Sequence, residues 1–519
     1  MRDLQSELFE LDPLALQNHL KLRLGDSELA TALREVERIS DLFHRLPPVE
    51  GPVSTLTLLE MRSLAASVSR YQLNLDAFLT QLFQQQHPDT CARLYALVMG
   101  ESPLALPQGM LMEALSLVTG VELDALQASY ALTRDLEDTT ERAQKGRRAV
   151  AQVHCRTGRP FTFMRRQLLT QLEPVLEAPA ASLRIDEEPL GLRVQIHRRH
   201  VLVHLYSERG QDISRAFPEV TSALEKALSG TDDLILEGIL YRADGNASKR
   251  RHALQARLLS LPLRRGEPPK TDTKMNVLIS ELLRQGREDL MLRGVQERRT
   301  RARQLLRSVE GVKMLDALPL STPSELSQRL KALTTAHQSW SATETLVAYN
   351  TTAPYTPGVE GSSFQLGPRL YSLLLTGVEV GSDGTAPTLR LACMHEGRPV
   401  PIGHTRLNKE PALVDLLKNL LARHTLIQHD GLHLLRPGIV VEARAMRLRK
   451  ATRRPAGVGL DGLEVMGLRL ELHEEHVLSR EGLIQLAEAM EKLELPAVAY
   501  AWASDNSGFD NSSQASSEI

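Results

Sequence analysis

The spacing of apolar residues changes near residue 183, and this change limits the possible folds more than any other feature of the chain. Over the first 150 residues, leucine and alanine recur at intervals of three and four, which is the period of amphipathic helices. From Leu192 to Ile196, and again from Val201 to Leu205, apolar residues alternate with others, as they do on a half-buried strand. The sequence therefore predicts a helical part up to about residue 150 and a β-hairpin over 192–205.

Both patterns return in the rest of the chain. Helices are predicted over 219–229, 275–308 and 323–337, around one or more antiparallel sheets. A second strand-rich region, from about residue 370 to 472, contains one helical segment, Pro411–Arg423, and this combination is typical of a small OB-type barrel. We thus expect a multidomain chain with α, α+β and β parts. The expected domains are 1–150 (helical), 160–368 (mixed), 369–503 (barrel) and a disordered Ser/Asn-rich tail, 504–519.

One helix in the N-terminal part has clear end signals. Pro107 suits a first helical turn, and Gly120 suits the left-handed residue that ends a helix. Between them, one apolar face is predicted from the spacing. That face consists of Leu111, Ala114, Leu115 and Val118.

Composition argues against several classes of protein. Cys91, Cys155 and Cys393 lie too far apart for a zinc knuckle and are too few for a disulfide framework, so we expect no metal and no resident cofactor. No apolar run reaches the length of about eighteen residues that a transmembrane helix needs, and the first residues are acidic rather than signal-like. We expect a cytoplasmic protein without a membrane partner.

Charge is unevenly distributed along the chain. Residues 1–150 hold 14 Lys/Arg and 21 Asp/Glu, whereas 249–313 hold 17 and 7. The basic segment fits either a polyanion partner or a solvated arginine-rich helix. Three histidines of the hairpin, His197, His200 and His204, suggest either a metal site or an exposed polar face, and we favour the exposed face.

Six collinear segments between roughly residues 85 and 475 form a recognisable pattern. They are RLYALVMGESPLALPQGMLMEAL from Arg93 with its continuation to Ala143, GLRVQIHRRHVLVHLYSERGQDISRAFPEV from Gly191, LILEGILYRADG from Leu234, QERRTRARQLL from Gln296, APYTPG ending at Gly358, and RPGIVVEARAMRLRK from Arg436. Together these segments resemble ATP-dependent DNA ligases of the archaeal type and their bacterial relatives. The resemblance implies a helical DNA-binding domain, a nucleotidyltransferase domain and an OB-fold domain.

The ligase family carries its nucleophile in the motif Lys-x-Asp-Gly. The lysine amine attacks the α-phosphorus of ATP and later releases AMP to a DNA phosphate. The matching positions here are Glu188-Pro189-Leu190-Gly191, or Arg184-Ile185-Asp186 if a gap is allowed, and no lysine occurs between Lys145 and Lys226. Neither match offers an amine that can be deprotonated.

The other family motifs also depart from the pattern. Glu208 replaces the arginine of Ser-Arg-x-Gly, and Ile239 replaces the acid of Asp-Gly-Glu. In the fourth motif Glu344 is kept, while Tyr349 replaces the lysine. Leu366 and Pro368 replace the two lysines of the fifth motif, and Arg469 is the one residue kept of Arg-Phe-Pro-Arg. Positions that turn or pack the backbone are kept: Gly191, Ser207, Gly210, Pro218, Glu219, Gly238, Tyr355, Pro357 and Gly358. From this sorting we expect a non-catalytic ligase homologue, not an enzyme.

Three function classes follow. The favoured one is a pseudo-ligase in DNA repair or processing that binds DNA or a partner protein; the resemblance implies nicked or end-containing DNA, a helicase and a nuclease as partners. Its expected nucleic-acid-binding residues are Arg209, Arg444, Arg447, Arg449, Lys450, Arg453, Arg454 and Arg469. The alternatives are a protein-interaction scaffold without nucleic-acid binding, and an active nucleotidyltransferase with relocated chemistry, in which a distant lysine such as Lys249 or Lys274 enters the pocket.

Overall fold

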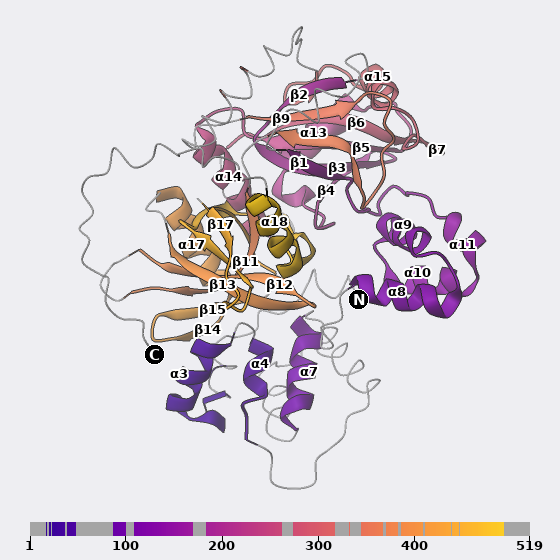
Figure 1. Ribbon diagram of the computed structural model, residues 1–519. Helices are drawn as coiled ribbons and strands as arrows, with labels where there is room; N and C mark the ends of the chain where they lie inside the picture. Colours follow the sequence, from indigo (N-terminus) through magenta and orange to yellow (C-terminus); the bar gives the residue numbers. More distant parts are fainter. Residues whose placement is uncertain are drawn as a thin grey trace.

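The structure is a computed structural model, and it shows a mixed arrangement of helices and sheets (Figure 1). It describes residues 17, 20–21, 23–36, 39–47, 87–99, 108–169, 183–261, 273–316, 328, 332, 344–366, 370–381, 386–407, 411–436, 438–445 and 447–492. The predicted tail and most of the helix predicted over 323–337 lie outside these residues. Within the described part of the chain, no helix is long and apolar enough to span a bilayer.

The described helices and strands have the following bounds. The helices are α3 (Asp26–Glu35), α4 (Ile39–Phe43), α7 (Pro88–Met99), α8 (Gln108–Thr119), α9 (Leu123–Thr133), α10 (Leu136–Gln144), α11 (Arg147–Ala151), α13 (Pro218–Ala227), α14 (Ala247–Leu259), α15 (Val295–Leu305), α17 (Pro411–His424) and α18 (Arg480–Lys492), with 3-10 turns η1 (Ser214–Ala216) and η2 (Glu474–His476). The strands are β1 (Arg165–Leu169), β2 (Leu183–Pro189), β3 (Gly191–Arg199), β4 (Leu202–Ser207), β5 (Leu234–Tyr241), β6 (Asn276–Gln285), β7 (Glu288–Asp289), β8 (Val312–Met314), β9 (Glu344–Asn350), β10 (Glu360–Leu366), β11 (Tyr371–Glu379), β12 (Thr388–His395), β13 (Arg398–Arg406), β14 (Thr425–His429), β15 (Leu432–Leu435), β16 (Val440–Arg444), β17 (Arg447–Lys450), β18 (Val458–Asp461) and β19 (Glu464–Leu468).

The described N-terminal helices form two separate groups (Figure 1). Helices α3, α4 and α7 share a hydrophobic core with Leu426 and Leu434 of strands β14 and β15, far along the chain. Helices α8 to α11 have a small core of their own. The described residues before 150 are therefore helical, as predicted, while the single domain 1–150 stays a prediction.

Helix α8 ends where the sequence indicates, but its buried face differs from the prediction. Gly120 has φ 68°, the left-handed conformation in which glycine commonly ends a helix. Val118 is 86 % exposed, whereas Met112, which the spacing did not select, is fully buried in the core with Val121 and Leu126. The predicted face was wrong because Leu, Ala and Val occur on both sides of this helix, and only its contacts with α9 and α10 decide which side is covered.

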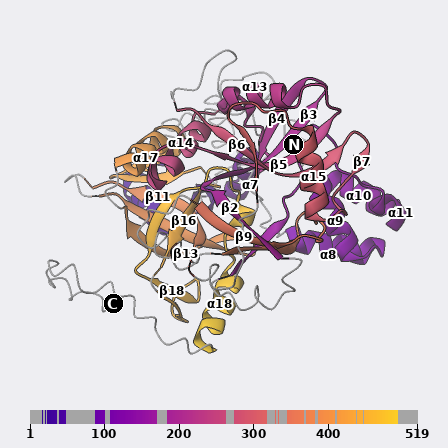
Figure 2. The ribbon, with the colours of Figure 1, turned by 90° about the horizontal axis from the view of Figure 1, so that it is seen from above.

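The middle of the chain contains two β-sheets. One has the strand order β1-β10-β9-β2, and the other has the order β4-β3-β5-β6-β7, with β8 paired to β6. Strands β3 and β4 pair antiparallel from Val194 with Ser207 to Arg199 with Leu202, which confirms the predicted hairpin. Helices α13, α14 and α15 pack around these strands, as Figure 2 shows from above.

The single helix predicted over 275–308 was wrong. Residues Asn276–Gln285 form strand β6, and only Val295–Leu305 form a helix, α15. Val277 and Ile279 alternate with less buried residues at the start of β6, and the strand is held by β5 on one side and by β8 on the other. Pairing with neighbouring strands overrides the weak helical signal of this segment.

The C-terminal part is strand-rich with one inserted helix, α17, at the predicted place. Its larger sheet contains β13-β12-β11-β15-β14 together with β16 and β19, and β17 and β18 form a separate hairpin. Leu373, Leu391 and Leu417 belong to the core between the sheet and α17. These facts agree with the coarse prediction of a sheet domain, and its assignment as an OB-type barrel stays a prediction.

Candidate functional site

The described motif positions gather where the two central sheets meet. Glu188 lies near the end of β2, Gly191 begins β3, Glu208 follows β4, Ile239 lies on β5 and Tyr349 on β9. Glu344 and Leu366 are the first residue of β9 and the last of β10, and Pro368 lies outside the described residues. Positions far apart in the sequence therefore do meet in one region, as the resemblance implies.

Glu188, which the sequence comparison matches to the family's lysine, is held by an arginine that sequence reasoning missed. Arg166 Nη1 and Nη2 donate to the two carboxylate oxygens of Glu188 at 2.6 and 2.8 Å. The Glu188 side chain is 4 % exposed and that of Arg166 is 13 % exposed. A buried carboxylate needs such a partner, and that need was the one available signal for a nearby cation.

A second buried pair joins strands β3 and β5. Arg193 Nη2 lies 2.6 Å from Glu237, and Arg193 Nη1 lies 3.2 Å from Glu208. The Tyr355 hydroxyl donates to the other oxygen of Glu237 at 2.6 Å, and burial together with that carboxylate raises the Tyr355 pKa. Burial alone would raise the pKa of Glu237, but the Arg193 guanidinium holds it below the usual range. Glu208 thus neutralises Arg193 and does not stand alone in a basic site.

A third pair joins β2 to helix α15. Arg299 donates from Nη1 to Asp186 at 2.9 Å and to the Tyr349 hydroxyl at 2.7 Å, and its guanidinium lies 4.3 Å from the centre of the Tyr349 ring. Asp186 is fully buried, and this burial raises its pKa despite the arginine. A positive charge, that of Arg299, therefore lies beside Tyr349, the residue that the sequence comparison matches to the family's lysine.

Two glycines allow strands β3, β5 and β6 of the second sheet to pair closely. A Cβ on Gly191 would lie 2.2 Å from the carbonyl oxygen of Leu240, and one on Gly238 would lie 2.8 Å from that of Leu278. No side chain fits at either position, so strands β3, β5 and β6 can pair only if these residues are glycine. This is the physical reason why both match the family while neighbouring charged positions do not.

The C-terminal part contacts this region through buried polar groups. Glu471 accepts a hydrogen bond from Gln255 of α14 at 2.8 Å and pairs with Arg469. Arg469 also lies 2.6 Å from Glu442, so its charge is fully engaged by two carboxylates. From the helical part, Arg134 donates to the carbonyl oxygens of Glu208 and Arg209 at 2.8 and 3.0 Å.

The basic residues predicted to meet DNA divide into two sets. Arg444 pairs with Glu464, Arg449 with Asp461 and Lys450 with Glu488. In contrast, Arg447, Arg453 and Arg454 on the β17–β18 hairpin are exposed and make no side-chain ion pair with the described residues. Arg209 is also exposed, in the turn after β4.

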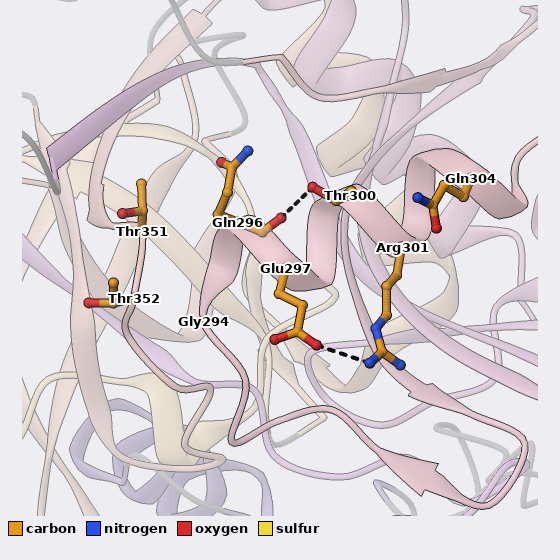
Figure 3. Close-up of a pocket in the computed structure, with 8 residues that line it drawn as sticks. All are labelled: Gly294, Gln296, Glu297, Thr300, Arg301, Gln304, Thr351 and Thr352. Atoms are coloured by element: carbon orange, nitrogen blue, oxygen red, sulfur yellow. Dashed lines mark hydrogen bonds and ion pairs between the residues drawn. The ribbon is translucent and has the colours of Figure 1, made fainter.

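The three buried pairs Arg166–Glu188, Arg193–Glu237 and Arg299–Asp186 are together called the charged site. A surface hollow of about 650 Å³ lies beside the start of helix α15, and none of these six residues lines it. It is lined by Gly294, Gln296, Glu297, Thr300, Arg301, Gln304, Thr351 and Thr352 (Figure 3). Arg301 points toward Glu297 and donates to it at 3.0 Å (Figure 3). The two charged residues that line the hollow are therefore paired with each other. None of the motif positions lines it.

The three hairpin histidines do not converge. His197 is completely buried, with Nδ1 accepting from the Gly158 backbone at 3.0 Å, His200 lies in the turn, and His204 pairs with Asp212 at 3.0 Å. The expected exposed polar face was wrong for His197, because the segment around Gly158 and Phe161 covers that side of the sheet. Among the described residues, no group of three or more His, Cys, Asp or Glu is arranged to hold a metal.

Comparison with known proteins points to one family. Residues 180–364 match the family model described as "ATP dependent DNA ligase domain". Relatives named DNA ligase include those of Thermococcus onnurineus (23 % identical, covering 80 % of this chain and 74 % of the relative) and Methanocaldococcus jannaschii (24 %, 87 % and 79 %). A solved mycobacterial DNA ligase D complexed with ATP and MES is 17 % identical, with a TM-score of 0.38, and the match covers 61 % of this chain and 97 % of that one.

These matches overturn two expectations drawn from the sequence. The chain was expected to be a non-catalytic pseudo-ligase and not an enzyme, but the relatives that match most of its length are named DNA ligase, and the matched model is that of a ligase domain. The motif comparison required each position to supply its own charge. The fold instead brings cations from other elements, such as Arg166 beside Glu188 and Arg299 beside Tyr349.

Proposed function

Because the chain belongs to the ATP-dependent DNA ligase family, we propose that it seals breaks in duplex DNA at the expense of ATP. The observation that carries this proposal is the match of residues 180–364 to the ligase domain. These residues form the second central sheet and all of the first except β1 and the end of β10. Nicked duplex DNA is the proposed substrate. We also propose that the protein acts together with a helicase or a nuclease.

The proposed chemistry begins with a covalent enzyme–AMP intermediate. An amine attacks the α-phosphorus of ATP, the bond to the leaving pyrophosphate breaks, and AMP then passes to a 5′-phosphate of DNA. The nucleophile has to come from outside the usual motif, because that position holds Glu188 and arginine stays protonated. Lys249 on α14 and Lys274 before β6 are the lysines we propose for this role; Lys249 is exposed, and Lys274 pairs with Glu310 at the surface.

Labelled ATP tests the proposal directly. The protein incubated with α-labelled ATP is expected to carry an acid-labile AMP adduct and to convert a nicked duplex into a sealed strand. One of the two substitutions Lys249→Arg and Lys274→Arg is expected to remove the nucleophile. That variant should form no adduct, and its rate of nick sealing should fall at least about a thousandfold. Absence of both adduct and sealing in the unmodified protein would refute the proposal.

DNA binding is proposed to use the β17–β18 hairpin. Arg447, Arg453 and Arg454 are exposed, while Arg469 is left out of the proposal because two carboxylates already neutralise it. Each arginine that meets a phosphate releases about 0.9 counterions, so the slope of log affinity against log salt reports the number of contacts.

Replacing all three exposed arginines with alanine is expected to weaken binding to nicked duplex and to flatten the salt slope by about 2 to 3. Fluorescence anisotropy at several salt concentrations measures both quantities. Arg449→Ala is the matched control on the same hairpin, since its charge is paired with Asp461 at 2.9 Å. An unchanged slope in the triple variant would exclude this hairpin as the DNA contact.

A further inference from the structure

The charged site contains three arginines, and they differ in how many of their donors are in use. A guanidinium has five N–H groups. Arg193 uses them on Glu237, Glu208 and the carbonyl oxygen of Met164. Arg166 makes two hydrogen bonds, both to Glu188, and no other to the residues that the structure describes.

The third arginine is closed off from a ligand. Arg299 and Asp186 are 8 % and 1 % exposed, and the Tyr349 ring lies against the guanidinium. A ligand could reach Arg299 only by displacing the carboxylate of Asp186. That carboxylate is buried, and its partners among the described residues are Arg299 and Tyr349. Of these three arginines, Arg166 alone combines partial exposure, a single partner among the described residues and donors that no described residue uses.

Arg166 lies on the first central sheet, and strands β2 and β9 and most of β10 in that sheet fall within the matched residues 180–364. Arg166 comes from β1 and Glu188 from β2, which are the two outer strands of the order β1-β10-β9-β2. Arg166 also acts electrostatically on Glu237 of the second sheet, so it lies near Arg193 as well.

A carboxylate held by two parallel N–H groups has nearly the geometry of a bound phosphate, because both anions accept bidentate hydrogen bonds from arginine. We propose that Arg166 binds a phosphate group of the substrate and that Glu188 is the counter-ion which this phosphate displaces. The inference rests on the proposed function and assigns a phosphate-binding residue to its site. The phosphate can come from ATP or from the 5′ end at a nick.

Glu188 then competes with the substrate for Arg166. Removing its charge while keeping its shape, as in Glu188→Gln, leaves Arg166 without a charged partner and removes a repulsion next to the incoming phosphate. Removing Arg166 has the opposite effect. The same strand provides a matched control, because Arg165 is exposed and is the immediate neighbour of Arg166.

The test measures ATP binding by calorimetry, and binding of nicked duplex with either a 5′-phosphate or a 5′-hydroxyl. Arg166→Ala is expected to weaken binding of the phosphate ligand at least about tenfold, Glu188→Gln to strengthen it about tenfold or more, and Arg165→Ala to change it less than about twofold. A loss in the ATP arm assigns the nucleotide phosphate, whereas a loss of the preference for 5′-phosphate assigns the DNA end. Unchanged binding in both arms for Arg166→Ala overturns the proposal.

Two further measurements keep the result clear. Arg166→Ala leaves the buried Glu188 without Arg166 as its partner and could therefore destabilise the fold. The double variant Arg166→Ala/Glu188→Gln, which removes both charges, is measured for comparison. This double variant is expected to fold and to bind as weakly as Arg166→Ala. Nick sealing is assayed separately. If the protein binds ATP through Arg166 but never seals a nick, the proposed function fails and the phosphate site stands; if it seals nicks and Arg166→Ala seals equally well, only the phosphate site fails.

Discussion

Replacing Arg298 with alanine is expected to lower the free energy of unfolding by about 3–5 kcal/mol, because the largely buried carboxylate of Glu281 would lose its partner. Arg298 is completely buried on α15. Its Nε donates to Glu281 of β6 at 2.7 Å, and its Nη1 donates to the carbonyl oxygen of Ala353 at 3.1 Å. One side chain therefore joins the helix, the central sheet and the segment after β9. Urea denaturation measures the loss.

Two variants separate this pair from a general effect of lost charge. Arg303 lies on the same helix and pairs with Asp316, but both side chains are more than half exposed, so Arg303→Ala should cost less than about 0.5 kcal/mol. Combining Arg298→Met with Glu281→Leu removes both buried charges and should recover at least about 1 kcal/mol relative to Arg298→Ala. A loss below about 1 kcal/mol for Arg298→Ala would contradict the assignment of a buried pair.

The protein is expected to lose stability steeply as the pH falls below 6.5, in part through His197. Burial lowers the pKa of His197 from 6.5 to about 3. Between these values the unfolded chain takes up a proton that the folded protein does not, so the free energy of unfolding falls by about 1.4 kcal/mol per pH unit for this group. The contribution is fully present above pH 6.5. His424 and His473, each with a pKa lowered by burial to about 4, act in the same direction.

Denaturation at pH 7.5, 6 and 5 checks this prediction. His197→Gln should remove about 1.4 kcal/mol per unit from the slope below pH 6.5, since glutamine is neutral throughout and can still accept from the Gly158 amide. The exposed His404 is the control, and His404→Gln should leave the slope unchanged. Equal slopes for the protein and for His197→Gln would mean that His197 becomes protonated in the folded state.

In the basic segment 249–313, the number of charges is known from the sequence, but the burial of the arginines is not. Its 17 Lys/Arg indicated either a polyanion partner or a solvated helix. Arg298 and Arg299 are instead buried, and their partners Glu281 and Asp186 lie on strands 17 and 113 residues away. No spacing rule connects Arg299 with Asp186, so the sequence could predict the charge of this helix but not where its arginines point.

The sequence indicated which segments meet, whereas the assignment of their residues to a functional site stays a prediction. The collinear motifs correctly indicated which segments meet, because close packing at Gly191 and Gly238 leaves a backbone signature that survives in the sequence. Arg166 could not be selected, because it reaches Glu188 from a strand outside the resembling segments. Arg299 lies within the segment from Gln296, but nothing in the sequence indicated that it pairs with Asp186. The expectation of an inactive protein arose from that limit.

The sequence by itself determined the helical first part, the hairpin over 192–205, helix α17 and the family. These features rest on local periodicity, turn residues and collinear motifs, which act over a few residues. The tertiary structure decided that 276–285 is a strand, that His197 is buried, that α3, α4 and α7 pack on β14 and β15, and that Glu188 is paired with Arg166. Each of these depends on partners that are distant in the sequence, and pairing and burial between distant segments override local preference.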